Sequence, residues 1–221
     1  MWCVPTASAE FVAAMEHILD VYQQPYDPLH PIVCFDETNK QLIAETRQPL
    51  PACPGQAARY DYEYKRNGTR NLFLFFEPLV GQRHIEVTQR RTKQDFAHQM
   101  RWLVDVAYPD ADCVEVVLDN LNTHKPASLY ETFEPAEANR ILKCLNFHYT
   151  PKHGSWLNMA EIEFSVILRQ LGARVPDEQT LKRRAKAVED SRNQAHSTVD
   201  WQFTSQDARV RLARLYPSIP E

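Results

Sequence analysis

Three acidic residues stand at positions where a metal site could be built. One apolar run leads directly into Asp36, and a second leads directly into Asp119. The third acid, Glu161, falls in a segment whose pattern predicts a helix. Taken alone, an apolar run that ends in Asp is also typical of an ordinary boundary between a strand and a turn. Together, the three acids lie on rigid elements that can bring distant parts of the chain to one point.

Carboxylates gathered in this way suit a divalent cation that works on phosphodiesters. Mg²⁺ prefers oxygen ligands and keeps several of its waters, so a few carboxylates suffice to hold it. Cleavage of a phosphodiester develops negative charge on the attacking and the leaving oxygen, and two ions about 3.5–4 Å apart can stabilise both. The three acids therefore predict a metal-dependent site that acts on nucleic acid.

Four strings of residues carry a family resemblance. They are Cys-Phe-Asp-Glu at 34–37, Arg-Arg-Thr-Lys-Gln-Asp-Phe at 90–96, Leu-Asp-Asn-Leu-Asn-Thr-His at 118–124 and His-Tyr-Thr-Pro-Lys-His-Gly-Ser-Trp-Leu-Asn-Met-Ala-Glu-Ile-Glu at 148–163. In this order they resemble the catalytic domain of bacterial insertion-sequence DDE transposases of the mariner superfamily. The resemblance implies an α/β, RNase H-like fold, a mixed sheet flanked by helices on both faces. It also implies a DDE triad, two Mg²⁺ ions with Mn²⁺ as a substitute, and cutting and joining of DNA at transposon ends.

Carried over by position, the resemblance assigns the catalytic and metal-binding triad to Asp36, Asp119 and Glu161. Glu163 is the alternative third member, because helical spacing puts the two glutamates on different apolar stripes and does not decide between them. The family's Leu-Asn-x-x-Glu pattern falls on Glu161. The 41 residues between Asp119 and Glu161 exceed the usual mariner-like interval. We attribute the excess to an inserted helical segment at about 135–145.

The amino-terminal half should contain one helix followed by strands. Apolar residues at helical spacing predict a helix over 8–23, with Ser8 as its cap. Strands are expected at 32–36, 41–46, 70–80 and 83–88. The Pro-rich segment 49–69 between them predicts a surface loop or a ragged hairpin. Its alternative role is contact with a partner subunit, as the corresponding insertion makes in mariner-like enzymes.

The carboxyl-terminal half should alternate helices and strands. We expect a helix over 93–107 capped by Thr92, a strand at 113–118, the helix at about 135–145, a strand at 146–149 and the helix that carries Glu161. The tail from Leu181 to Tyr216 predicts two helices packed on the sheet or on a second subunit. The expected domains are an amino-terminal helix and linker at 1–30, the catalytic core at 31–172, and carboxyl-terminal helices at 173–221.

Composition sets limits on class and compartment. The chain has 221 residues, of which 43% are hydrophobic and 24% charged, as in an ordinary soluble globular domain. No run of about 18 apolar residues exists to span a membrane, and the amino terminus does not resemble a secretory signal. Five scattered cysteines without a Cys-x-x-Cys pair suggest reduced thiols. We expect a cytoplasmic protein associated with the bacterial nucleoid.

The net charge of −4 is unusual for a protein that must neutralise DNA phosphates. Family members carry an amino-terminal helix-turn-helix region that recognises the transposon ends, and there is no room for one before Asp36. The sequence is therefore expected to be the catalytic portion alone, truncated or separately encoded.

Seven residues are candidates for contact with DNA, and they fall in three groups. These are Arg90, Arg91 and Lys93 ahead of a helix, Asn120 and His124 after Asp119, and Lys152 and His153 before the helix of Glu161. His124 alternatively orients the Asp119 carboxylate or caps a turn. Glu37 should point to the opposite face of its strand from Asp36 and play a structural part.

The sequence leaves three functions open. The first is the transposase catalytic domain, acting on transposon ends and target DNA and expected by resemblance to be a homodimer. The second is an RNase H-like nuclease without strand transfer. The third is an inactive transposase remnant that pairs with a full-length partner.

Overall fold

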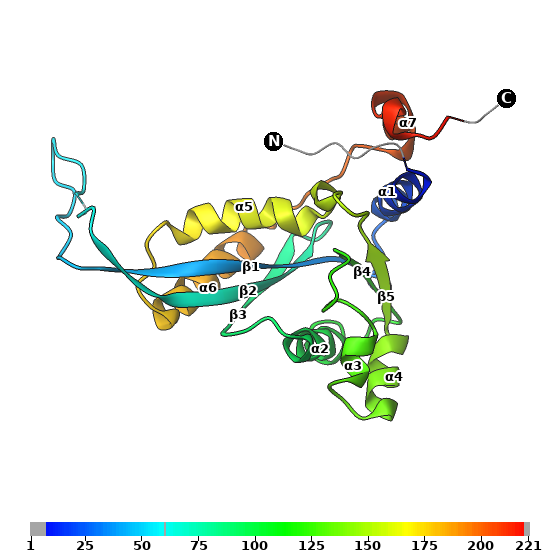
Figure 1. The fold of residues 1–221 in the computed structure, drawn as a ribbon, viewed down its shortest axis with the longest axis horizontal. Helices are drawn as coiled ribbons and strands as arrows, with labels where there is room; N and C mark the ends of the chain where they lie inside the picture. The colour runs from blue at the N-terminus through cyan, green and yellow to red at the C-terminus, as the bar shows by residue number, and fades with distance from the viewer. Residues whose placement is uncertain (1–7, 60, 219–221) are drawn as a thin grey trace.

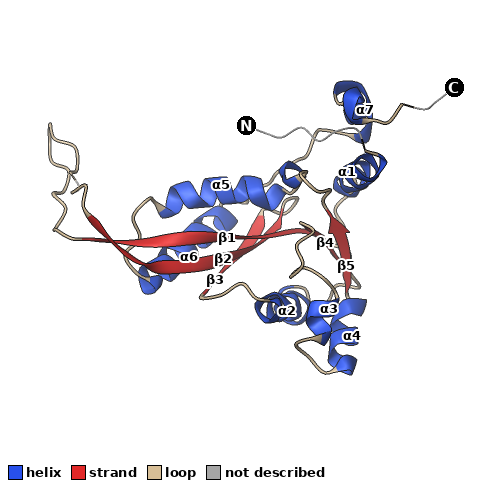
Figure 2. Ribbon diagram, in the orientation of Figure 1, coloured by secondary structure: helices blue, strands red, loops and turns tan. Residues whose placement is uncertain are grey.

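A five-stranded mixed sheet forms the centre of the protein, and its strand order is β3-β2-β1-β4-β5 (Figure 2). The computed structural model describes residues 8–59 and 61–218. The strands are β1 (Ile32–Glu45), β2 (Tyr64–Glu77), β3 (Gln82–Thr88), β4 (Val114–Leu118) and β5 (Leu145–Tyr149). The first three strands pair antiparallel, whereas β4 runs parallel to β1 and β5 runs parallel to β4. This arrangement confirms the predicted mixed sheet.

Helices cover both faces of the sheet, as predicted (Figure 1). One face carries α1 (Ala9–Tyr22), α5 (Met159–Leu171) and α6 (Glu178–Gln194). The other carries α2 (Lys93–Trp102), α3 (Ala127–Tyr130) and α4 (Pro135–Lys143). The short helix α7 (Ser205–Arg211) packs on α1. Within the described part of the chain, none of these helices combines the length and hydropathy needed to cross a membrane.

Alternation along the central strands divides the core in two. Successive side chains of a strand point to opposite faces. The side chains that face α1, α5 and α6 include Cys34, Leu72, Leu74 and Phe76. Those that face α2 include Val33, Phe35, Phe73 and Phe75. The continuous apolar run of β2 is thus buried on both faces, as its sequence predicts.

The β1–β2 hairpin is longer than predicted. The two strands expected at 32–36 and 41–46 are one strand, and β2 begins at Tyr64 rather than near residue 70. Beyond the core, both strands carry polar residues, which pair across the ladder without producing an apolar pattern that sequence reasoning could detect. We call residues 41–69 the arm; Figure 1 shows it reaching away from the body, and its proline residues lie near the tip.

The remaining elements follow the predictions with local differences. Ser8 and Thr92 cap α1 and α2 with their side chains, as expected. The helix expected over 93–107 changes at Leu103 into a π-helical turn, Leu103–Ala107. The insertion after Asp119 contains two short helices, α3 and α4, instead of one. The tail helices were predicted to pack on the sheet or on a second subunit. Of these, α6 packs on the sheet, against β3. Residues 1–7 of the predicted segment 1–30 lie outside the described residues.

Candidate active site

Asp36 lies at the point where β4 stops pairing with β1. The parallel register joins Cys34 to Val117 and ends there, and β4 itself ends at Leu118, directly before Asp119. Asp36 and Asp119 each lie two residues past this last pair, so both stand where the two strands separate. The sequence predicted that a strand ends at Asp36. In the structure β1 continues to Glu45, paired with β2 alone.

The carboxylates of Asp119 and Glu161 lie near enough to Asp36 for their charges to act on its pKa. Burial raises the pKa of Asp36 to about 7. The amide of Glu37 donates to Asp36 Oδ1 at 2.8 Å and opposes this rise. The pKa of about 7 also includes the effect of the negative charges of Asp119, Glu37 and Glu161, which act in the same direction as burial. Asp36 thus carries a charge that its protein surroundings disfavour.

Glu161 and Glu163 lie in opposite environments, although they are neighbours on α5. Glu161 is exposed in the first turn of the helix, and its carboxylate has no hydrogen-bond or ion-pair partner among residues 8–59 and 61–218. The side chain of Glu163 is 3% exposed and points into the protein. It accepts hydrogen bonds from Arg192 Nε at 2.6 Å and from Arg192 Nη2 at 2.9 Å. Glu163 is therefore already neutralised inside the fold.

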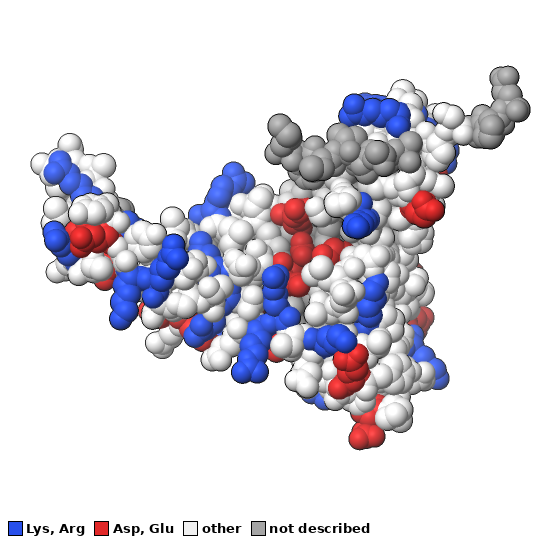
Figure 3. Space-filling view, in the orientation of Figure 1, with Lys and Arg blue, Asp and Glu red and all other residues white. Residues whose placement is uncertain are grey.

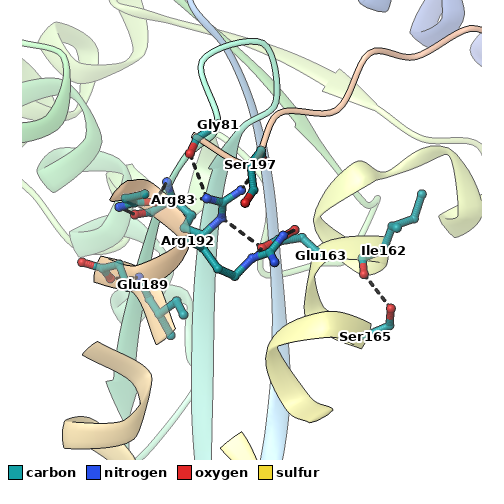
Figure 4. A network of polar contacts seen from close by, with 10 residues as sticks. Gly81, Arg83, Ile162, Glu163, Ser165, Glu189, Arg192 and Ser197 are labelled. Carbon is teal, nitrogen blue, oxygen red and sulfur yellow. Dashed lines mark hydrogen bonds and ion pairs between the residues drawn. The ribbon is translucent and has the colours of Figure 1, made fainter. Parts of the chain in front are cut away.

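A buried network of polar groups completes the surroundings of Glu163 (Figure 4). Arg83, on β3, has a fully buried side chain, and its Nε lies 2.9 Å from Glu163 Oε1. The same guanidinium donates to the carbonyl oxygens of Gly81 and Ser197 at 2.8 Å. This network joins β3, α5 and α6, so Glu163 connects elements of the fold.

His124 connects Asp119 to Glu37 on the α2 side of the sheet. Its Nδ1 lies 2.5 Å from Asp119 Oδ1, and its Nε2 lies 2.7 Å from Glu37 Oε2. The imidazole is 1% exposed and packs against the rings of Phe35 and Phe96. Burial alone would lower the pKa of His124, but the two carboxylates outweigh it and raise the pKa to about 9. His124 is therefore hydrogen-bonded to Asp119, a contact compatible with its predicted role in orienting that carboxylate, and its ring is buried in this structure.

Glu37 has the structural part that its strand position predicted. It points to the opposite face from Asp36, where Arg91 Nη1 lies 3.9 Å from its Oε1. The pairing with His124 was not predicted. The only signal in the sequence was the alternation that separates Glu37 from Asp36, because His124 lies far along the chain.

Asn158 is a second residue whose contacts sequence reasoning missed. It caps α5, where its Oδ1 accepts from the amide of Ala160 at 3.0 Å. Its Nδ2 donates to the carbonyl oxygen of Phe35 on β1 at 2.9 Å. The cap was visible in the Leu-Asn-x-x-Glu pattern, but the bond to Phe35 depends on the tertiary fold.

The donor set of Asp36, Asp119 and Glu161 fits a hard divalent cation. All three supply carboxylate oxygens, which Mg²⁺ prefers, and the mutual repulsion that raises the pKa of Asp36 is what a cation would relieve. Among the described residues, no three His, Cys, Asp or Glu side chains lie close enough to hold a metal as they stand. Because Asp119 is turned toward His124, side-chain rotation would be needed to close the set.

The other candidate DNA-contact residues are spread around this region. Arg90 and Arg91 are exposed, as are Asn120, Lys152 and His153. Lys93 is engaged with Glu131 at 2.7 Å, and Asn120 accepts from Lys125. Figure 3 shows acidic side chains gathered near the middle of one face, with Lys and Arg side chains beside them and along the arm.

The model of the family described as DDE superfamily endonuclease matches residues 31–182. No curated protein matches the sequence.

Solved structures of the Mos1 mariner transposase share the fold. The pre-cleavage Mos1 transpososome aligns with a TM-score of 0.64 at 14% identity, over 99% of this chain and 66% of that one. The Mos1 paired-end complex with Mn aligns with a TM-score of 0.60 at 14% identity, over 89% and 60%. The Mos1 strand transfer complex gives 0.57 at 17% identity, over 88% and 59%. The RNase H-like fold expected from the sequence is confirmed, and the chain spans less than two thirds of these transposase chains.

Proposed function

The chain belongs to the DDE superfamily endonuclease family, and from this premise we propose that it is the catalytic portion of an insertion-sequence transposase of bacterial, mariner-like kind. It would cut DNA at the ends of the element and join the cut ends to a target. The observation that supports this proposal is that the charges of Asp119 and Glu161 act on Asp36, whose own carboxylate has no basic partner among the described residues. The similar Mos1 structures include a paired-end complex with Mn and a strand transfer complex, which supports the same chemistry.

Asp36, Asp119 and Glu161 would hold two Mg²⁺ ions, for which Mn²⁺ can substitute. The chemistry that these ions supply in such a site is stabilisation of the charge that develops on the attacking and leaving oxygens. Glu161 is the third member rather than Glu163, because Glu163 is occupied by Arg83 and Arg192. Asp36 remains half-buried beside the carboxylates that repel it.

Two neighbouring side chains, His124 and Glu37, would orient the Asp119 carboxylate. His124 holds one carboxylate oxygen of Asp119 through Nδ1, so the other oxygen is free to turn toward Asp36. Glu37 in turn holds His124 through Nε2 and fixes its ring orientation. Carboxylates that ligate metals are commonly oriented by such outer partners.

In the proposed reaction, water attacks a phosphodiester at the transposon end and the 3′-oxygen leaves as a hydroxyl. This 3′-hydroxyl then attacks a phosphodiester of the target DNA, and the target's own 3′-oxygen leaves. Lys152 and His153, exposed just before α5, and Arg90 and Arg91 on the α2 side are proposed to contact DNA phosphates. Lys93 and Asn120 would have to leave Glu131 and Lys125 to join them.

The rest of the assembly is proposed from the resemblance. Residues 31–172 form the core, 1–30 lead into it, and 173–221 pack on it. The arm exposes Leu50, Tyr62 and Tyr64 at its outer end, a composition suited to contact with a second subunit in a homodimer or with a full-length transposase. The protein is proposed to act at the bacterial nucleoid.

Nicking of supercoiled plasmid in Mn²⁺ tests the catalytic assignment. We expect the purified chain to nick, and Asp119→Asn to lose the activity while keeping its far-ultraviolet circular dichroism spectrum. Asp110→Asn is the matched control, because Asp110 is an exposed acid outside the site. Nicking by Asp119→Asn at the rate of the unaltered chain would refute the assignment.

Two alternatives give different results. An RNase H-like nuclease would nick but would give no joined product from a pre-cut transposon end. An inactive remnant would not nick and would co-purify with full-length transposase.

A further inference from the structure

One buried amide connects the strand of Asp36 with the helix of Glu161. Asn158 is 1% exposed, and both ends of its side-chain amide are hydrogen-bonded. The donor end bonds the carbonyl oxygen of Phe35, which immediately precedes Asp36. The acceptor end bonds the amide of Ala160, which immediately precedes Glu161. A single side chain thus bridges the backbone beside two candidate ligands.

The strand needs a partner at this point. β4 pairs with β1 as far as Cys34 and no farther. Phe35 is the next residue of β1, and its buried carbonyl would cost free energy without a hydrogen bond. The side chain of Asn158 supplies the donor where β4 has ended.

The helix start is held by further bonds at the same junction. Tyr22, at the end of α1, donates from its hydroxyl to the carbonyl oxygen of Leu157 at 2.7 Å. The same hydroxyl lies 3.5 Å from Cys34 Sγ. The first residue of α5, Met159, is 2% exposed. The amino terminus of α5 is therefore fixed against β1 from two sides.

The way α5 is capped leaves its third residue free. In α2 and α7 the acid at the third position, Asp95 or Asp207, folds back to accept from the backbone amide of the capping threonine. In α5 the corresponding residue is Glu161. The amide of Asn158 instead donates to the carbonyl oxygen of Ser155 at 2.8 Å, in the preceding turn. The carboxylate of Glu161 is thus not consumed by the cap.

We propose that Asn158 is a positioning residue that sets the separation between Asp36 and Glu161 and keeps Glu161 available as a ligand. This inference rests on the proposed function of the same three acids. Its chemistry is that of an outer partner, whose loss typically weakens metal binding about 10–100-fold. Asn158 does not itself bind the metal, because both ends of its amide are already occupied.

The test is Mn²⁺ binding by the full chain, measured without DNA by electron paramagnetic resonance of the free ion. Asn158→Ser keeps a capping oxygen for Ala160 and removes the donor that reaches Phe35. Asn158→Ala removes both. We expect both variants to bind Mn²⁺ about 10–100-fold more weakly, and the serine variant to be the more thermally stable of the two. If Asn158→Ser is more stable than Asn158→Ala but binds Mn²⁺ equally weakly, the loss of Mn²⁺ affinity comes from the lost bond to Phe35 and not from loss of the helix cap.

Tyr22→Phe is the matched control at the same junction. It removes the bond to Leu157 and leaves both bonds of Asn158 in place. We expect its Mn²⁺ affinity to stay within about twofold of the unaltered chain while its melting temperature falls. If Asn158→Ser does not fold, Asn158→Thr carries the same comparison with more of the buried volume filled.

The outcomes distinguish this inference from the proposed function. Weakened binding in Asn158→Ser, with normal binding in Tyr22→Phe, supports the positioning role. Binding by Asn158→Ser within twofold of the unaltered chain, while Asp119→Asn loses it, overturns the positioning role and leaves the metal site standing. Equal binding by the unaltered chain and Asp119→Asn overturns the metal site and the positioning role together.

Discussion

Two groups of carboxylates differ in how their charge is balanced. Around β3 and α6, Glu163 is paired with Arg83 and Arg192, and Glu189 is paired with Lys186. Where β4 ends, Asp36 lies near three further acids and no arginine or lysine ion-pairs with it among the described residues. The contrast is sharpest on α5, where Glu161 and Glu163 belong to different groups.

The pKa values express the same difference. Burial alone would raise the pKa of Glu189, but hydrogen bonds from His84, Lys186 and the amide of Ile85 outweigh it and lower the pKa to about 2. Burial and neighbouring carboxylates raise the pKa of Asp36 to about 7. A carboxylate whose charge is balanced within the fold supports the structure. A carboxylate whose charge the fold leaves unbalanced is typical of a functional site.

The largest expected effect is on activity, in Glu161→Gln. The change removes one ligand charge, and we expect metal-dependent nicking to fall on the order of 10³-fold. The free energy of unfolding should stay within about 0.5 kcal/mol of the unaltered chain, since Glu161 is exposed. Plasmid nicking and urea denaturation measure the two quantities. Full nicking activity in this variant would place the third ligand elsewhere.

The reciprocal change, Glu163→Gln, should act on stability. Arg83 would keep a buried charge with its carboxylate partner removed, which we expect to cost about 3 kcal/mol of unfolding free energy. Urea denaturation at one temperature compares Glu163→Gln with Glu161→Gln, a matched glutamate two positions earlier on the same helix. At low temperature, folded Glu163→Gln should still nick. A stable but inactive Glu163→Gln would reverse the assignment of the two glutamates.

A smaller effect should appear in the pH dependence of Glu189. A carboxylate whose pKa is lowered on folding stabilises the protein above its unfolded pKa of about 4.5, and this contribution is lost as the pH falls toward 2. We expect Glu189→Gln to be less stable by about 2 kcal/mol at pH 7, with the difference shrinking between pH 5 and pH 3. Denaturation at pH 7, 5 and 3.5 measures this.

Asp190→Asn is the control for that experiment, because Asp190 shares Lys186 as a partner but is exposed. Its stability difference from the unaltered chain should be small at every pH. A difference for Glu189→Gln that is constant from pH 7 to pH 3.5 would contradict the role of its charge.

The parts of the fold that local pattern controls were predictable from the sequence. The helix of residues 9–22, the buried run of β2 and the end of β4 directly before Asp119 all follow from short-range spacing. The strand end expected at Asp36 was wrong, because β1 continues to Glu45. The continuity of β1 was missed, because its outer half is polar and pairs only through the ladder to β2. The π-helical turn at Leu103–Ala107 likewise leaves no mark that separates it from an α-helix in the sequence.

Contacts between distant residues account for the rest. Which of Glu161 and Glu163 is free depends on Arg83 and Arg192, which come from other elements. The bond from Asn158 to Phe35 joins residues 123 positions apart. Periodicity within one helix cannot report such partners, so the choice between the two glutamates required the resemblance first and the tertiary structure afterwards.

The pairing of β1 with β2 has a register shift between Gln41 and Ile43, at the base of the arm. Such irregularities bend a strand and increase its local twist. Regular pairing from Asp36 with Leu74 to Gln41 with Thr69 separates this register shift from the region of the three candidate acids. The shift therefore affects the direction of the tip and leaves Asp36 in register. One continuous strand thus combines an irregularity toward its outer end with regular pairing at its inner end.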